Sequence, residues 1–224
     1  MANNFLYETH MHTSEGSKCA TNTAAQQVQA YKQRGYTGVI ITDHFINGYC
    51  TCPRHLAWDD KMRYVTSGYI AAKKEGARCG LDVFFGWEFS YKGADFLTYG
   101  LGLDFLIAHP NIDKTTPQQY SKLVRAAGGY IAQAHPFRKA SYIKKIDIDP
   151  YILDGVEVFN ASDPPEHNQK AEKFAKKHGL PMQAGTDSHS VNSNFVSGIA
   201  LKRRAANIQD IIADIKGGLV ELIC

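Results

Sequence analysis

Side chains that bind divalent metals follow five short apolar runs of this sequence, each at the point where the run ends. The five ends are His10-Met11-His12, Asp43-His44, Glu88, His135 and Asp187-Ser188-His189. Imidazole and carboxylate groups together suit zinc, iron or manganese, and such a set needs no cysteine. Seven candidate ligands exceed what one tetrahedral ion takes, so the pattern indicates two or three ions.

The spacing inside two of these ends favours convergence. His10 and His12 are two residues apart, as are Asp187 and His189. Alternate residues of an extended strand point to the same face, so both imidazoles of the first pair can reach one ion. Glu88 supplies a carboxylate that can bridge two cations.

Each end also has a plainer interpretation when it is taken alone. His44 could be a hydrogen-bonded structural histidine, and Glu88 could be the buried partner of an arginine. Asp187-Ser188-His189 could form a turn or a helix cap, because Asp and Ser favour both. Five separate coincidences at five strand ends are a poorer explanation than one shared site.

Short β-rich runs alternate with helical stretches along the chain. Strands are predicted over residues 38–42, 82–89, 95–101, 129–134, 155–159, 180–184, 197–201 and 219–223, and helices over 23–34, 56–75, 117–127, 164–178 and 208–216. This alternation is typical of a parallel sheet. In a closed barrel all parallel strands end at one rim, so ligands on five strands favour a barrel over an open sheet. No G-x-G-x-x-G or Walker A loop supports a nucleotide-binding fold.

The overall composition excludes several classes of protein. The chain has 224 residues, 44% of them hydrophobic, which suits a single α/β domain over residues 1–224. A formal net charge of +3 is too near neutral for a dedicated nucleic-acid binder. No apolar run approaches the roughly 20 residues of a membrane span, and the first residues do not resemble a signal peptide. Five irregularly spaced cysteines argue against a disulfide framework, so we expect a cytoplasmic protein.

The motifs HMHTSEGS, ITDH, GWE, AHP and GTDSH, in this order, resemble the PHP (polymerase and histidinol phosphatase) superfamily of metal-dependent phosphoesterases. The resemblance runs from His10 to about Leu201, and the ordered set is specific although each motif is weak alone. It implies a distorted (β/α)7 barrel, in agreement with the alternation of elements. It also implies a cluster of up to three divalent ions, which would be zinc, manganese or iron.

The resemblance further implies a role for each matched residue. His10, His12, Glu88 and Asp187 would hold the first ion, Glu88 and His135 the second, and His44 and His189 the third. The third site of the family normally gains an acidic or histidine ligand soon after H-x-H. Glu15 is the nearest candidate here, whereas Ser17 and Lys18 stand at the more usual spacing. Many members also place a histidine between the Glu and A-H-P motifs, where His109 and Asp95 compete for the role.

Phosphate-ester hydrolysis is the reaction that this ligand set and the resemblance predict. Clustered divalent ions would supply a metal-bridged hydroxide as the nucleophile. Arg138 follows His135 by three residues and is expected to bind the substrate phosphate, with possible help from Lys18. Asn160 ends the GVEVFN run and could order a ligand or a water. The predicted catalytic set is Arg138, Asp187 and His189.

The expected substrate is a small phosphomonoester resembling histidinol phosphate, a nucleotide or a sugar phosphate. No membrane or nucleic-acid partner is indicated, and the oligomeric state is left open. A 3′–5′ exonuclease or phosphodiesterase acting on oligonucleotides would share the metals but should have a basic groove. An amidohydrolase would usually need a lysine at a strand end, and none is seen.

An aromatic loop, residues 45–58, follows the second strand end. It either caps the core or encloses an organic leaving group through Tyr49, His55 or Trp58. Cys50-Thr51-Cys52 lies within it. A single C-x-C pair is weak evidence for structural zinc, so reduced loop cysteines are the favoured interpretation.

Overall fold

A computed structural model describes residues 4–141, 143–146, 148–193 and 195–224. The strands are β1 (Phe5–Met11), β2 (Gly38–Ile41), β3 (Asp82–Tyr91), β4 (Ala94–Tyr99), β5 (Tyr130–Ala134), β6 (Gly155–Asn160), β7 (Met182–Gly185), β8 (Gly198–Leu201) and β9 (Glu221–Ile223). The helices are α1 (Ala24–Gln33), α2 (Trp58–Val65), α3 (Ser67–Cys79), α4 (Leu103–Ala108), α5 (Pro117–Ala126), α6 (Pro165–His178) and α7 (Ile208–Lys216), with short 3-10 turns η1 (Ile112–Lys114) and η2 (Pro150–Ile152).

These strands form one mixed sheet in the order β7-β6-β5-β4-β3-β2-β1-β8-β9. The pairs β1–β2, β2–β3, β5–β6 and β6–β7 are parallel. Strand β4 runs antiparallel to both of its neighbours, β3 and β5. The start of β4 therefore lies at the same edge of the sheet as the ends of β3 and β5.

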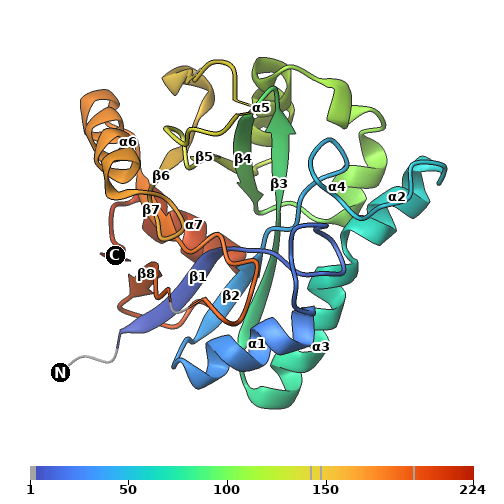
Figure 1. Cartoon of the computed structure of the whole chain (residues 1–224), viewed down its shortest axis with the longest axis horizontal. Helices are drawn as coiled ribbons and strands as arrows, with labels where there is room; N and C mark the ends of the chain where they lie inside the picture. Colours follow the sequence, from blue (N-terminus) through green and yellow to red (C-terminus); the bar gives the residue numbers. More distant parts are fainter. Residues whose placement is uncertain (1–3, 142, 147, 194) are drawn as a thin grey trace.

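The sheet curls until the chain after β7 meets β1 (Figure 1). Met11 and Ser188 form a parallel bridge there, and the backbone N–H of His12 donates to the carbonyl of Ser188 at 2.9 Å. Strands β1 to β7 thus enclose a nearly closed barrel, while β8 and β9 extend the sheet beyond β1. The predicted distorted (β/α)7 barrel is confirmed.

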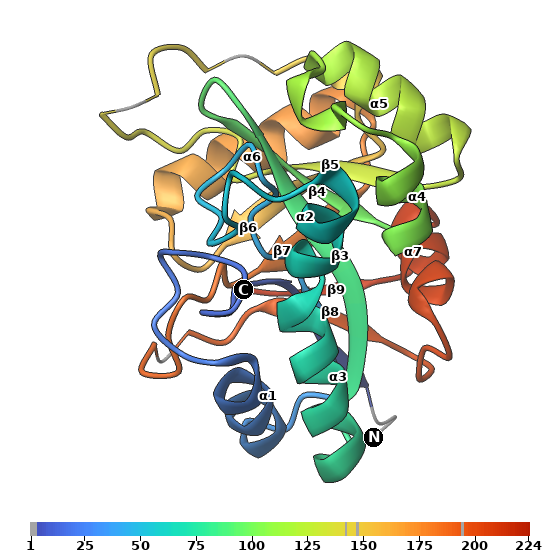
Figure 2. The same ribbon diagram turned by 90° about the vertical axis from the view of Figure 1, so that its right-hand side faces the viewer.

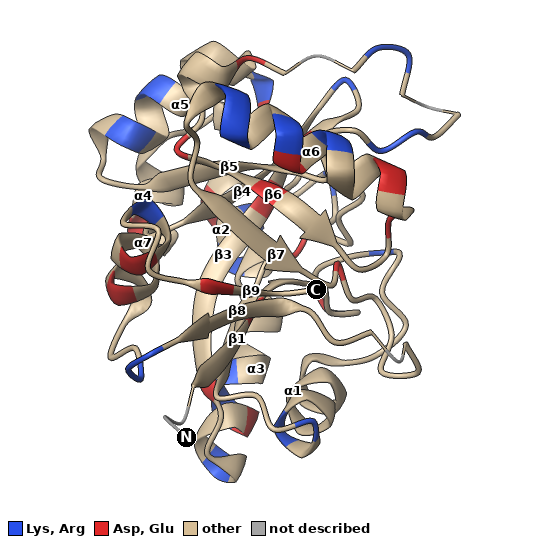
Figure 3. Ribbon diagram, turned by 90° about the vertical axis from the view of Figure 1, so that its left-hand side faces the viewer, with Lys and Arg blue, Asp and Glu red and all other residues tan. Residues whose placement is uncertain are grey.

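Helices cover the outside of the strands, and α1 and α3 lie side by side (Figures 1 and 2). Threonine caps begin two of them: Thr23 and Gln26 form a capping box at α1, and Thr116 and Gln119 form one at α5. Lysines and arginines recur on α5 and α6, with acidic residues interspersed on α6 (Figure 3). Among the helices in the described part of the chain, none combines the length and apolar character that a membrane span requires.

A buried polar chain lies inside the barrel and ties distant strands together. The hydroxyl of Tyr130 donates to Gln183 at 2.9 Å, the amide of Gln183 donates to the hydroxyl of Tyr99 at 2.8 Å, and that hydroxyl donates to the carbonyl of Thr9 at 2.7 Å. Each of these buried hydroxyls and amides has a partner, so their burial carries no unmet hydrogen-bonding cost. The chain links β1, β4, β5 and β7 and fixes the strands that carry the rim residues.

The predicted helix over residues 56–75 is wrong as one element, because the chain breaks into α2 and α3 at Thr66. The hydroxyl of Thr66 donates to the carbonyl of Arg63 at 2.9 Å, a local bond that competes with helix continuation. The break brings Gly68 against the rim loops, where an added Cβ would lie 2.3 Å from a carboxylate oxygen of Asp43. Helical periodicity alone did not reveal this close approach.

Candidate metal centre

The seven predicted ligands and Asp95 converge at one rim of the barrel. In the described residues, four overlapping groups place one ligand atom of every member within 4.8 Å of the others. The first group is His10, His12 and Glu88, and His10, His135 and Asp187 form a group that overlaps it. The second group is Glu88, Asp95 and His135, and the third is His12, His44 and His189. Their roles as ligands stay predictions, but their juxtaposition is a property of the fold. Strands far apart in the sequence bring them together, although Glu88 lies inside β3, which continues to Tyr91, and Asp95 lies near the start of β4.

Two of these residues lie at sharp turns of the backbone. His135 directly follows β5 and has a φ of 29°, and Asp187 lies two residues after β7 with a φ of 53°. Such positive values are uncommon for residues other than glycine and concentrate at functional sites. Both turns occur where the chain leaves a strand at the rim.

His10, His12 and Asp187 lie close together where the first group and the overlapping group meet. The Nε2 atoms of His10 and His12 are 3.1 Å apart, and Asp187 Oδ1 lies 3.4 Å and 3.2 Å from them. Glu88 approaches both imidazoles at 3.5 Å, one oxygen to each. The four side chains enclose a space whose lining atoms are nitrogen and carboxylate oxygen.

A buried carboxylate that the sequence prediction missed, Glu157, orients His10. Glu157 Oε1 lies 2.9 Å from His10 Nδ1, and its other oxygen accepts from the backbone N–H of His135 and the amide of Asn160, each at 2.9 Å. This leaves His10 Nε2 facing the centre. Asn160, predicted to order a ligand or a water, acts here on Glu157. A glutamate inside the apolar GVEVF run was the signal that could have identified it.

Replacing Glu157 with glutamine is expected to lower metal affinity about 10–100-fold, because carboxylates behind histidine ligands set their orientation and basicity. A chelator-competition titration measures this affinity. Glu166→Gln, at an exposed position of α6, is the matched control and should leave it unchanged. Equal affinities for both variants would contradict the orienting role.

The second imidazole, His12, is oriented by Ser17 and Asp43. Ser17 Oγ donates to Asp43 Oδ1 at 2.7 Å and lies 3.0 Å from His12 Nδ1. Because that hydroxyl proton is used on Asp43, Ser17 accepts from His12, which carries its proton on Nδ1. The lone pair of His12 Nε2 therefore points into the centre.

The residues present fit divalent ions. Glu88 Oε2 and His44 Nδ1 are buried and lie 2.8 Å apart, yet neither has an aligned hydrogen-bond partner. Buried polar atoms without partners are rare and costly. A cation coordinated by such atoms would satisfy them, and the imidazole and carboxylate donors suit zinc, manganese or iron.

Charges at the centre are strongly coupled. Burial opposes protonation of His10, but the nearby carboxylates, Asp187 foremost, raise its pKa well above the ordinary value. Burial raises the pKa of Glu88, yet His44 and His10 outweigh it and hold that pKa well below its usual range. The pKa of His12 falls to about 3 because of burial first and neighbouring imidazoles second. The buried carboxylates thus require positive charge beside them, which protons or metal ions can supply.

The metal-free protein is expected to lose stability as pH rises above neutral. Protonated His10 and His44 have raised folded pKa values, so their contribution is present below the unfolded value of 6.5 and is lost as pH rises through the folded values. Glu88 and Asp187 have lowered folded pKa values, so their contribution is present above the unfolded values of 4.5 and 3.8 and is lost only in acid. Bound ions would replace the histidine protons and remove the alkaline loss. Unfolding midpoints measured above neutral pH with and without chelator check this, and identical profiles would contradict it.

Of Asp95 and His109, the structure brings only Asp95 into the second group. Asp95 lies at the start of β4, opposite Ala134, and shares a group with Glu88 and His135. His109 lies elsewhere, at the end of α4, with Nδ1 2.7 Å from the carbonyl of Phe105. The geometry supports Asp95.

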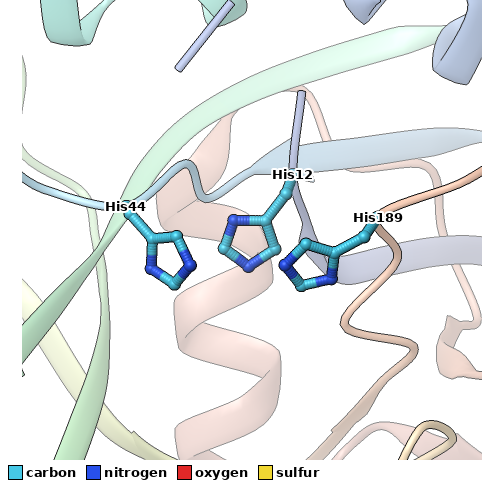
Figure 4. A group of neighbouring side chains, drawn as sticks. All are labelled: His12, His44 and His189. Carbon is cyan, nitrogen blue, oxygen red and sulfur yellow. The ribbon is translucent and has the colours of Figure 1, made fainter. Parts of the chain in front are cut away.

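His12, His44 and His189 form the third group, with their rings gathered together (Figure 4). The ring centroids of His12 and His44 are 4.5 Å apart, and those of His12 and His189 are 4.3 Å apart. His189 Nδ1 lies 2.8 Å from the carbonyl of Asp187, which leaves its Nε2 available. His12 thus borders the first and third groups.

Glu15 and Lys18 lie outside the four groups. The carboxylate of Glu15 accepts from the backbone N–H of Ala24 at 2.9 Å and so contacts the first turn of α1. The structure therefore does not support Glu15 as a ligand. Lys18 is exposed, with its ammonium 5.8 Å from the centre of the Tyr49 ring.

Arg138 is held by acidic side chains of the site. Its guanidinium lies 2.6 Å from Asp163 Oδ1 and 2.8 Å from Asp187 Oδ2, and it donates to Asn160 at 3.3 Å. These contacts orient the carboxylate of Asp187. Arg138 also lines the open cavity, so binding of a substrate phosphate stays a prediction.

A cavity of about 550 Å³ opens above the metal groups. Its walls include Asn47, Tyr49, Ser90 and Lys92, beside the histidines and carboxylates of the rim. In the aromatic loop, Tyr49 lines the cavity and is 60% exposed, whereas the indole of Trp58 donates to the carbonyl of Leu106 at 2.8 Å. Enclosure of a leaving group by this loop stays a prediction. His55 is exposed and Cys50 is a buried free thiol.

Comparison with known proteins supports the fold. Residues 165–218 match a family described as PHP-associated. No curated protein matches the sequence. A two-domain protein from Bacteroides vulgatus, described as containing a predicted PHP-like metal-dependent phosphoesterase, has a TM-score of 0.75 at 14% identity over 99% of this chain. This chain covers 65% of that longer protein.

Two other solved structures carry different descriptions. An amidohydrolase from Chromobacterium violaceum, with bound sulfate and no metal, has a TM-score of 0.56 at 13% identity over 96% of this chain and 97% of its own. A lesion-specific endonuclease from Pyrococcus furiosus has a TM-score of 0.62 at 13% identity over 98% of this chain and 58% of its own. At these identities the likeness establishes a shared fold, and the substrate must be argued from the site.

Proposed function

We propose that this chain belongs to the PHP superfamily and is a metal-dependent phosphatase that acts on a small phosphomonoester. The PHP-associated match over residues 165–218 and the fold shared with a PHP-like protein support this proposal. The observation that carries the proposal is the convergence of imidazoles and carboxylates around Glu88 at the mouth of a cavity. Glu88 belongs to two of the groups and lies 2.8 Å from His44, a member of a third. One carboxylate therefore adjoins every place where an ion would be held.

Divalent ions bound there would lower the pKa of an attacking water and hold the oxygens of the phosphoryl group. The side chains at the rim would hold these ions and bind the phosphate. The first ion would be held by His10, His12, Asp187 and Glu88. The second would be held by Asp95, His135 and the same Glu88, and the third by His12, His44 and His189. Arg138 and Lys92 line the cavity with positive charge, which would attract and orient a phosphate dianion.

The cavity favours a small substrate over a polymer. Its volume of about 550 Å³ is within the range of small-molecule sites. Tyr49 and Asn47 offer an aromatic face and an amide to an organic leaving group. On α6, the basic side chains are accompanied by acidic ones, as in the pair Lys176–Glu172 at 2.6 Å, and such a mixed surface does not form the basic groove of a nuclease.

Phosphate release from a panel of metabolites tests this proposal. Histidinol phosphate, nucleoside monophosphates and sugar phosphates would be assayed with Mn²⁺, Zn²⁺ or Fe²⁺ after removal of other metals. We expect release from at least one monoester and no release from a His10→Ala/Glu88→Ala variant. Cleavage of an oligonucleotide or an amide by the metal-loaded protein, without any monoester hydrolysis, would overturn the proposal in favour of those activities.

A further inference from the structure

The third group of metal-binding side chains offers three imidazoles, from His12, His44 and His189. Zinc in proteins usually takes four ligands. The acidic side chain expected to add to this group, Glu15, instead contacts the start of α1. Glu88 Oε2, 1% exposed, lies 2.8 Å from His44 Nδ1 without the alignment of a hydrogen bond, so an ion beside His44 would satisfy both atoms.

Cys19 is held beside this group by hydrogen bonds on both sides of it in the chain. The backbone N–H of Thr21 donates to the carbonyl of His189 at 2.9 Å. The backbone N–H of His44 donates to Ser17 Oγ at 3.0 Å. Thr21 and Ser17, which stand two residues to either side of Cys19, are therefore hydrogen-bonded to His189 and His44.

The thiol of Cys19 interacts with both imidazoles, His44 and His189, and lines the cavity. His44 and His189 line the same cavity as Cys19, so the sulfur and the two imidazoles face one space. Cys19 is a free cysteine and forms no disulfide.

We propose that Cys19 is the fourth ligand of the ion held by His12, His44 and His189. The thiol would lose its proton to solvent when its sulfur binds the metal. A donor set of three nitrogens and one sulfur favours zinc or ferrous iron over manganese or magnesium at this position. This inference rests on the proposed function, because the ion belongs to the same site, and it assigns that ion's identity.

Cobalt substitution of the full chain tests the sulfur ligand directly. Wild type loaded with Co²⁺ is expected to show a near-ultraviolet sulfur-to-cobalt charge-transfer band. Cys19→Ser should lose the band and bind the third Co²⁺ roughly tenfold or more weakly, since even changes behind a ligand cost that much. Cys79→Ser, which removes another partly exposed free thiol, is the matched control and should keep both. Cys19→Asp should restore binding of the third ion without the band, which excludes a folding defect.

The proposal is overturned if wild type binds a third Co²⁺ without the band, binds only two ions, or if Cys19→Ser keeps the band. Phosphate release is measured separately on the same preparations. Release without the band would overturn Cys19 ligation and spare the proposed function. The band without phosphate release from any monoester would support Cys19 ligation and overturn the proposed function.

Discussion

Glu88→Gln is expected to abolish metal binding at two of the three positions and to lower phosphate release about 10³-fold, equivalent to about 4 kcal/mol of transition-state stabilisation. The substitution keeps the shape of the side chain but removes the charge beside His10, His12, His44 and His135. An amide also presents a donor to imidazoles whose lone pairs would otherwise face a cation. Metal content by elemental analysis and the rate of phosphate release measure the two effects.

Glu172→Gln serves as the control for this loss. Glu172 is an exposed residue of α6 that pairs with Lys176 at 2.6 Å and is remote from the rim. Its replacement should leave metal content and rate within about twofold of wild type, because exposed ion pairs contribute little. A Glu88→Gln variant with wild-type metal content would show that Glu88 does not bridge the ions.

Asp43→Ala is expected to destabilise the fold by about 3–5 kcal/mol, because it leaves three buried donors without an acceptor. Asp43 is 2% exposed and accepts from the backbone N–H and hydroxyl of Thr13 and from the hydroxyl of Ser17, at 2.7, 2.6 and 2.7 Å. Ser17 in turn orients His12. Urea unfolding of the metal-free protein measures the stability, and chelator competition should show weaker metal binding as well.

Two milder variants calibrate this result. Asp43→Asn keeps one carbonyl acceptor and should lose less stability than Asp43→Ala. Thr13→Val removes one of the three donors, the Thr13 hydroxyl, and should lower the free energy of unfolding by about 1–2 kcal/mol. If Asp43→Ala were no less stable than Thr13→Val, the hydrogen-bonded loop would not have the structural role described.

The fold and most of the rim could be predicted from sequence because apolar strands end abruptly on ligand-type residues. His10, Glu88 and His135 each follow such a run, and the barrel brings the ends of its parallel strands together. Helix limits were also close where a cap marks them, as at Thr23 and at the left-handed Gly179. At these positions the residue type alone indicates both the local backbone structure and the role of the side chain.

Other features depended on the direction and packing of the chain. Asp95 stands at the beginning of its strand, and only the antiparallel course of β4 carries it to the rim. Glu157 lies inside the apolar run of β6 and not at its end, so the search for ligands at the ends of such runs did not identify it. Glu15 was predicted because it is the acidic residue nearest the H-x-H motif, and no signal in the sequence indicated Cys19. The course of the loop, tied by hydrogen bonds to His189 and His44, places Cys19 in the wall of the cavity.

Anomalous diffraction from crystals of the protein loaded with zinc tests the central claim, that this rim holds a cluster of ions. The structure predicts anomalous peaks at three positions: one among His10, His12, Glu88 and Asp187, one among Glu88, Asp95 and His135, and one among His12, His44 and His189. The last peak should also lie within bonding distance of the Cys19 sulfur. No peak at the rim, under conditions in which the protein is saturated with zinc, would contradict the account.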